Sequence, residues 1–141
     1  MKIRSHKATN CFEKIKVVLS VYQSVFRLQK KYILNTILYP LDSTRYGEFA
    51  YLLKYIRKNN IALADKKILD ISSPFMMAYI LSRNAYVTKT DINPEEKRSI
   101  KENLNLQFKE EDGTKLSFSD NSFDMSYSIS VIEHIYNGSK Q

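Results

Sequence analysis

Three aspartates recur at a fixed interval in the second half of the chain. Asp70, Asp91 and Asp112 lie 21 residues apart, and each ends a short run that is typical of a β-strand. A carboxylate accepts hydrogen bonds from hydroxyl and amino groups such as those of a ribose or a purine. The interval has room for one strand, one helix and two turns, and open α/β sheets bind ligands at the carboxyl ends of their strands. The spacing therefore predicts a site for a nucleoside-containing cofactor.

The periodicity of the apolar residues predicts the elements that would position these carboxylates. Helical spacing extends over 12–34 and again from Tyr46 to Ile56, where Asp42-Ser43-Thr44 offers a cap and Asn59-Asn60 an end. Further helices are predicted from Pro74 to about Asn84, from Asn93, and from Val131. The predicted strands are 67–71, 86–90, 106–110 and 123–130.

This order predicts an α/β fold, a Rossmann-like doubly wound and mainly parallel sheet of about four strands that is incomplete. Residues 1–60 are expected to form a helical N-terminal extension, and residues 61–141 a partial Rossmann-like domain.

Composition limits the classes of protein that fit. No segment approaches the ~20 apolar residues of a membrane span, and the N-terminus lacks the pattern of a secretory signal. A single cysteine, Cys11, excludes an internal disulfide framework and favours a cytoplasmic protein. With only His6 and His134 besides, no metal site is expected.

The net charge of +7 is unevenly distributed. Residues 1–60 contain 12 Lys/Arg against 3 Asp/Glu, whereas residues 61–141 contain 10 against 12. Such asymmetry can mark an anionic partner, but a solvated basic helix face is the simpler explanation. No alternation of aromatic and basic residues indicates a nucleic-acid module, so no nucleic-acid partner is expected.

Two of the three aspartates, Asp91 and Asp112, have two interpretations each. Asp91 can accept both ribose hydroxyls of a nucleoside, or it can cap the helix that begins near Pro94. Asp112 can accept the amino group of an adenine while Gly113 allows close approach. Alternatively, Asp112-Gly113 is simply a common turn dipeptide.

The segment Asp112-Gly-Thr-Lys-Leu116-Ser-Phe118-Ser-Asp120-Asn-Ser-Phe123-Asp124 resembles a loop of the class I S-adenosylmethionine-dependent methyltransferases, small-molecule branch. The family pattern is D-x-x-x-L-P-F-x-D-x-S-F-D, with serine here in place of proline. The run from Ser128 to Ile135 also resembles the family's segment after the fourth strand. The resemblance covers about residues 65–136.

The resemblance implies S-adenosyl-L-methionine as the cofactor and an unidentified methyl acceptor as the partner. It implies that Asp91 holds the ribose, Ile92 packs on the adenine, and Ser128 lies beside the methionine part. The full set of expected cofactor-binding residues is Asp70, Ser72, Asp91, Ile92, Asp112, Gly113 and Ser128. His134 is a weak candidate for a catalytic base and otherwise a packing residue.

The first cofactor loop departs from the family. The family pattern D-x-G-x-G-x-G is represented here by Asp70-Ile-Ser72-Ser-Pro74-Phe-Met76. Side chains at glycine positions crowd a ligand, and a positive φ costs a non-glycine residue about 1–2 kcal/mol. A loop with Ser73 as cap and Pro74 opening the helix could still present a helix N-terminus to an anion.

The family's sheet has seven strands in the order 3-2-1-4-5-7-6, and four are predicted here. The chain is therefore expected to be a truncated enzyme, or to pair its open sheet edge with a partner. One function is methyl transfer, or cofactor binding for it. A second is a degenerate, non-catalytic interaction protein. A nicotinamide-dependent oxidoreductase shares the acidic residue after the second strand but leaves the 112–124 loop unexplained.

Overall fold

The computed structural model describes residues 12, 14–16, 18–19, 43–94 and 105–131. Residues 12, 14–16 and 18–19 are helical, and the rest of the predicted first helix lies outside the described residues. The remaining described elements are α3 (Ser43–Lys58), β1 (Lys67–Ile71), α4 (Phe75–Leu81), β2 (Tyr86–Asp91), β3 (Leu106–Glu110) and β4 (Met125–Tyr127).

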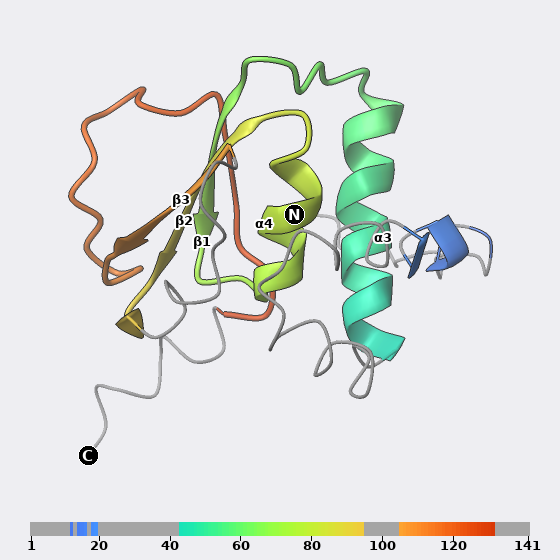
Figure 1. The fold of residues 1–141 in the computed structure, drawn as a ribbon, viewed down its shortest axis with the longest axis horizontal. Coiled ribbons are helices and arrows are strands. Elements are labelled where there is room, and N and C mark those ends of the chain that lie inside the picture. The colour runs from blue at the N-terminus through green and yellow to red at the C-terminus, as the bar shows by residue number, and fades with distance from the viewer. Residues whose placement is uncertain (1–11, 13, 17, 20–42, 95–104, 132–141) are drawn as a thin grey trace, which may run out of the picture.

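The four strands form one parallel sheet in the order β3-β2-β1-β4. Helices α3 and α4 lie on one side of the sheet, and the segment from β3 to β4 crosses the other side (Figure 1). The predicted Rossmann-like α/β fold is confirmed, and the sheet is open. Because all four strands run the same way, their carboxyl ends meet at one edge.

Helix α3 ends where the sequence predicts. Asn60 adopts a left-handed backbone with φ of 50°. The Asn60 N–H donates to the Arg57 carbonyl, and the Ile61 N–H donates to the Ile56 carbonyl. These two bonds are the Schellman pattern, which satisfies carbonyls that the helix leaves unpaired.

The core lies between the sheet and the two helices. The short helix α4 is buried from Met76 to Leu81, and α3 contributes Phe49, Ala50 and Ile56. On the sheet, Ile68 and Val87 face this core. Asp70 follows Ile68 by two positions and Lys89 follows Val87 by two, so both point toward the same layer. The core thus determines which polar side chains are buried beneath the carboxyl edge.

The fourth strand is shorter than the predicted 123–130. The ring of Phe123 packs edge-on against Phe118 in the preceding loop, with centroids 4.9 Å apart. Beyond Tyr127, the Ser128 hydroxyl donates to the carbonyl of Ile71 at the end of β1, and the Ile129 N–H donates to the Ser73 hydroxyl in the following loop, so the ladder does not continue. Ser130 then turns the chain with φ of 54°. Side-chain contacts with neighbouring segments therefore end the strand early.

Candidate functional site

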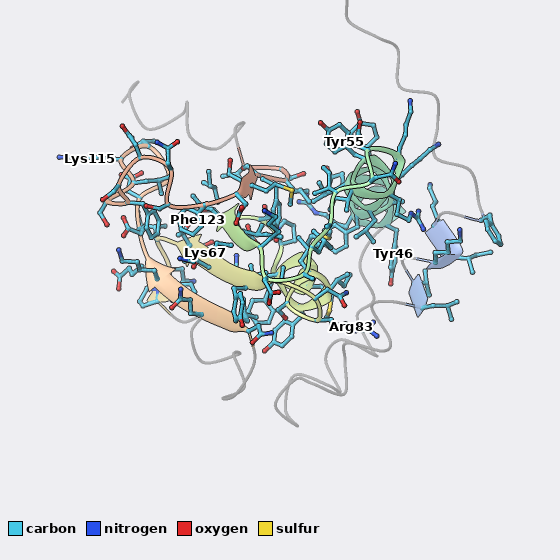
Figure 2. The ribbon with its side chains drawn as sticks, turned by 90° about the horizontal axis from the view of Figure 1, so that it is seen from above. Tyr46, Tyr55, Lys67, Arg83, Lys115 and Phe123 are labelled. Carbon is cyan, nitrogen blue, oxygen red and sulfur yellow. The ribbon has the colours of Figure 1, made fainter. Side chains whose placement is uncertain are left out.

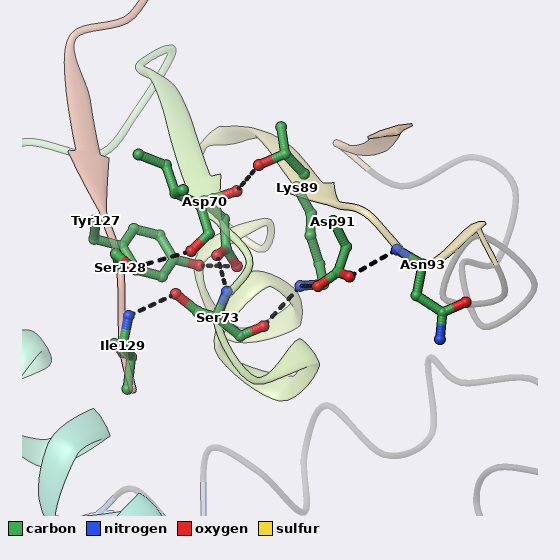
Figure 3. Close-up of polar contacts among 10 residues, drawn as sticks. Asp70, Ser73, Lys89, Asp91, Asn93, Tyr127, Ser128 and Ile129 are labelled. Atoms are coloured by element: carbon green, nitrogen blue, oxygen red, sulfur yellow. Dashed lines mark hydrogen bonds and ion pairs between the residues drawn. The ribbon is translucent and has the colours of Figure 1, made fainter. Parts of the chain in front are cut away.

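Asp70 lies one residue before the end of β1 and is fully buried. Its Oδ1 accepts the Ser73 N–H at 2.9 Å, and its Oδ2 accepts the Tyr127 hydroxyl at 2.7 Å (Figure 3). Burial raises the pKa of Asp70, and the positive charge of Lys89 and these hydrogen bonds oppose that rise. Through these bonds, the buried Asp70 carboxyl group holds the loop after β1 in position.

Tyr127 is the β4 partner of Asp70 in the sheet register, and its hydroxyl is held in the same buried layer. Burial, and then the negative charge of Asp70, raises the pKa of Tyr127 well above its ordinary value. The phenol consequently remains a hydrogen-bond donor. No motif or spacing in the sequence marks this tyrosine as part of the site.

Lys89 is a second buried polar residue that the sequence analysis missed. It pairs with Asp70 in the register of β1 and β2, and its side chain is 0 % exposed. Its Nζ donates to the Ser73 carbonyl at 2.7 Å and lies 4.0 Å from Oδ2 of Asp91. The alternation of side chains along a strand could have identified this residue, because it places Lys89 on the same inward face of β2 as Val87 and Asp91.

One residue of the loop after β1, Ser72, has a backbone conformation that glycine favours. Ser72 has φ of 53°, in the left-handed region that favours glycine. The Ser72 N–H donates to the Thr90 carbonyl, which ties the loop to β2. Ser72, at the first glycine position of the family pattern, thus adopts a backbone conformation that favours glycine.

The expected cap at Ser73 is wrong. Pro74 occupies the N-cap position of α4, without a side-chain cap, and the helix begins at Phe75. The Ser73 hydroxyl instead accepts the Ile129 N–H at 2.9 Å (Figure 3). The reason lies in the tertiary structure, because the segment after β4 supplies a buried N–H that needs an acceptor.

Asp91 ends β2 at the rim of the sheet, where its side chain is 17 % exposed. Its Oδ1 accepts the Asn93 N–H at 2.9 Å. The carboxylate therefore holds the turn after β2 while part of it still faces solvent, and the rest of the helix expected from Asn93 lies outside the described residues. The neighbouring Ile92 is 72 % exposed. A flat ligand can therefore pack on the Ile92 side chain and donate a hydrogen bond to the Asp91 carboxylate.

Asp112 is exposed, and its carboxylate organises its own turn. Oδ1 accepts both the N–H and the hydroxyl of Thr114, at 2.8 and 2.7 Å. These bonds lower the pKa of Asp112, the backbone N–H contributing most. Gly113 has no positive φ, so the turn does not require a glycine there. The turn interpretation of Asp112-Gly113 is supported by this geometry.

Ser128 is exposed directly after β4, and its hydroxyl donates to the Ile71 carbonyl at 3.1 Å. It therefore lies next to the end of β1. The sheet thus brings Asp70, Ser72, Asp91 and Ser128 to the ends of three neighbouring strands. Asp112 follows β3, the outer strand of the sheet.

The segment 112–124 has structural contacts of its own. Asp124 accepts the Lys66 ammonium at 2.8 Å and the Lys67 N–H at 2.9 Å, which fixes the crossover to the start of β1. Between this segment and the sheet lies a pocket of about 330 Å³ lined by Leu69 and residues of 116–126. Leu69 alternates with Asp70, so the pocket is on the opposite face of the sheet from the buried Asp70 layer. Its lining includes none of the predicted cofactor residues (Phe123 and Lys115 in Figure 2 mark this segment).

His134, the predicted base, lies outside the described residues. Within the described part of the chain, no three His, Cys, Asp or Glu side chains are grouped so as to hold a metal ion. The described helices include none with the length and apolar character to cross a membrane.

Comparison with known proteins agrees with this geometry. A family model described as a methyltransferase domain matches residues 70–140, which is half of the chain. No curated protein and no solved structure matches the chain. The matched region begins at Asp70 and includes β2, β3, β4 and the 112–124 segment. The chain therefore belongs to the class I S-adenosylmethionine-dependent methyltransferase family.

Proposed function

We propose that this chain is the cofactor-binding part of an S-adenosylmethionine-dependent methyltransferase, and that the carboxyl edge of its sheet binds the nucleoside of that cofactor. The proposal depends mainly on one observation. At the end of β2, the partly exposed Asp91 carboxylate is followed directly by the exposed Ile92 side chain. A carboxylate there accepts ribose hydroxyls, and an apolar side chain beside it packs on a purine.

The residues at the nucleoside end fit the cofactor. Asp91 uses Oδ1 for the Asn93 N–H, and a carboxylate oxygen has more than one lone pair, so it retains acceptor capacity. Ser72, at a glycine position of the family pattern, has the left-handed backbone that favours glycine. Asp112, Gly113 and Ser128 flank this edge and are proposed as further contacts.

The loop after β1 departs from the family pattern at Ser72, Pro74 and Met76. Ser73 and Asp70 are buried and bonded to other parts of the protein, so neither faces solvent directly. When bound, S-adenosylmethionine supplies an electrophilic methyl group on sulfur. The part of the protein is to orient the donor and to exclude water, which can provide most of the acceleration of methyl transfer. The methyl acceptor is unidentified, and His134 stays a prediction for its base.

The test is calorimetric titration with S-adenosylhomocysteine, comparing the protein with Asp91→Asn. Asparagine retains an Oδ1 acceptor for the Asn93 N–H, so the turn survives while the charge is lost. Hydrogen bonds to a charged group contribute about 1.5–3 kcal/mol, so affinity should fall by about 10- to 100-fold.

Asp65→Asn is the matched control. Asp65 is exposed in the turn before β1, at the opposite edge of the sheet, and asparagine tolerates its left-handed φ of 60°. Affinity should be unchanged in this variant. Equal affinities in the protein and in Asp91→Asn would contradict the proposed ribose contact.

A second function is supported by the loop after β1. Serine, proline and methionine at the family's glycine positions, together with the buried Lys89, favour a non-catalytic methyltransferase-like protein that acts by binding a partner. The same titration separates the two functions, because absence of heat at millimolar ligand would favour the non-catalytic one.

The single cysteine supports a reducing, cytoplasmic setting for either function.

A further inference from the structure

Three apolar side chains in the helical residues near the N-terminus face solvent. Phe12 is 62 % exposed, Ile15 is 49 % exposed and Leu19 is 57 % exposed. Intervals of three and four residues place side chains on one side of a helix, so these three residues form one surface, the N-terminal apolar face. A helix that packs only against its own protein buries such a face and exposes its charged residues. Here the order is reversed, because Lys14 and Lys16 are half-buried.

The N-terminal apolar face lies apart from the core and from the proposed cofactor site. The described residues of this helix lie beyond α3, on the side away from the sheet (Figures 1 and 2). The core formed by the described residues includes none of Phe12, Ile15 and Leu19. Stabilising the sheet therefore does not explain why three large apolar side chains share this surface.

Positive charge accompanies the N-terminal apolar face. The Lys16 ammonium lies 4.4 Å from the centroid of the Phe12 ring. Residues 1–41 contain eight Lys/Arg and one Asp/Glu, which gives a formal charge of +7, equal to that of the whole chain. An apolar face with lysines beside it is typical of helices that lie in the surface of a membrane.

We propose that the N-terminal apolar face binds an anionic lipid surface and so holds the methyltransferase domain at a membrane. Phe12, Ile15 and Leu19 enter the boundary between headgroups and acyl chains, and the two lysines extend their ammonium groups to the headgroup phosphates. Each Lys or Arg near an anionic membrane strengthens binding by about fivefold. A nucleic acid matches the charge but has no apolar layer to receive Ile15 and Leu19, whereas a lipid surface matches both.

The test is flotation of the full chain with vesicles of phosphatidylcholine and phosphatidylserine, and with vesicles of phosphatidylcholine alone. The protein should bind the anionic vesicles, bind the neutral vesicles more weakly, and lose affinity as the salt concentration rises. The triple variant Phe12→Gln/Ile15→Gln/Leu19→Gln should lose about 100-fold or more in affinity, because its side chains no longer partition into the lipid. Lys14→Gln/Lys16→Gln should lose about 10- to 30-fold.

Tyr86→Gln is the matched control, because Tyr86 is 52 % exposed at the start of β2 and is not part of the N-terminal apolar face. Its affinity for vesicles should be unchanged. The triple variant replaces exposed side chains with a good helix former, so its thermal unfolding should match that of the unmodified protein.

Failure to bind the anionic vesicles overturns the proposal, as does binding that the triple variant retains in full. If the triple variant unfolds at a lower temperature, Lys14→Gln/Lys16→Gln decides, and unchanged affinity in that variant overturns the proposal. Size-exclusion chromatography adds a further outcome. A protein that self-associates, and that becomes monomeric in the triple variant, overturns the proposal because the face then contacts a second copy of the chain.

Discussion

At the scale of single residues, a buried polar layer links the ends of β1, β2 and β4. Asp70 is its centre, with the Tyr127 hydroxyl on one side and the Lys89 charge on the other. A buried carboxyl group is tolerated only when its oxygens are hydrogen-bonded. The layer therefore holds the loop after β1 in one position beneath the carboxyl edge of the sheet.

Tyr127→Phe tests this layer. The variant removes the O–H that donates to Asp70, so the pKa of Asp70 should rise further, and at neutral pH the free energy of unfolding should fall by about 1.5–3 kcal/mol. Because the native pKa is raised, the Asp70 contribution is most favourable below about pH 4 and declines as pH rises through the native pKa. The loss in the variant should therefore grow with pH.

Urea unfolding between pH 4 and pH 8 measures the effect of Tyr127→Phe. Tyr55→Phe is the control, since Tyr55 is 52 % exposed on α3 and should show no such trend. A loss in Tyr127→Phe that does not depend on pH would contradict the assigned bond to Asp70.

At the scale of elements, the segment from β3 to β4 is fixed at its end by Asp124. This aspartate is the last position of the family-like loop, and its contacts are with Lys66 and the Lys67 backbone rather than with the proposed site. Parallel strands require a crossover of this kind, and here it passes over the face of the sheet opposite α4 (Figure 1). Part of the loop motif is thus explained by chain connection and not by ligand binding.

Asp124→Asn should destabilise the protein at neutral pH. The Lys66 hydrogen bond, and then the Lys67 N–H, lower the pKa of Asp124. The contribution of Asp124 is therefore present above about pH 4 and is lost as pH falls through the native pKa. Thermal melts at pH 7 and pH 3 should show a larger decrease in melting temperature for the variant at pH 7 than at pH 3.

Asp120→Asn is the control for this prediction, because Asp120 is exposed in the same segment. It should leave the melting temperature unchanged at both pH values. An equal decrease in both variants would indicate a general effect of charge and not the bond to Lys66.

At the scale of the whole molecule, α3 belongs to the same hydrophobic core as the sheet. Phe49 and Ala50 are completely buried beside residues of α4 and β1, and Glu48 accepts the Ser130 hydroxyl from the segment after β4. The predicted boundary between an extension and a domain at residue 60 stays a prediction. The packing of α3 nevertheless makes it a support for the strands that carry the site.

Phe49→Ala should lower the free energy of unfolding by about 3–5 kcal/mol, because a buried aromatic ring is lost and a cavity remains. Tyr55→Ala on the exposed side of α3 should change it by less than about 0.5 kcal/mol. Denaturant unfolding compares the two. A loss in Phe49→Ala as small as that in Tyr55→Ala would show that α3 contributes little to folding of the sheet.

The sequence by itself predicted the first three strands, their succession along the chain and the ends of α3. Period-two and helical spacing, turn residues and the 21-residue interval are local properties, and they predicted β1, β2 and β3 closely. The family-like loop also identified the class of protein. Even the left-handed backbone at Asn60 followed from a local preference of asparagine.

Only the tertiary structure decided which carboxyl group is exposed. Asp70, Asp91 and Asp112 look equivalent in the sequence, yet Asp70 is buried, Asp91 is partly exposed and Asp112 binds its own turn. Lys89 and Tyr127 became partners of Asp70 because strand register, which depends on residues distant in sequence, brings them together. Burial and charge compensation arise from such distant contacts, and local patterns do not encode them.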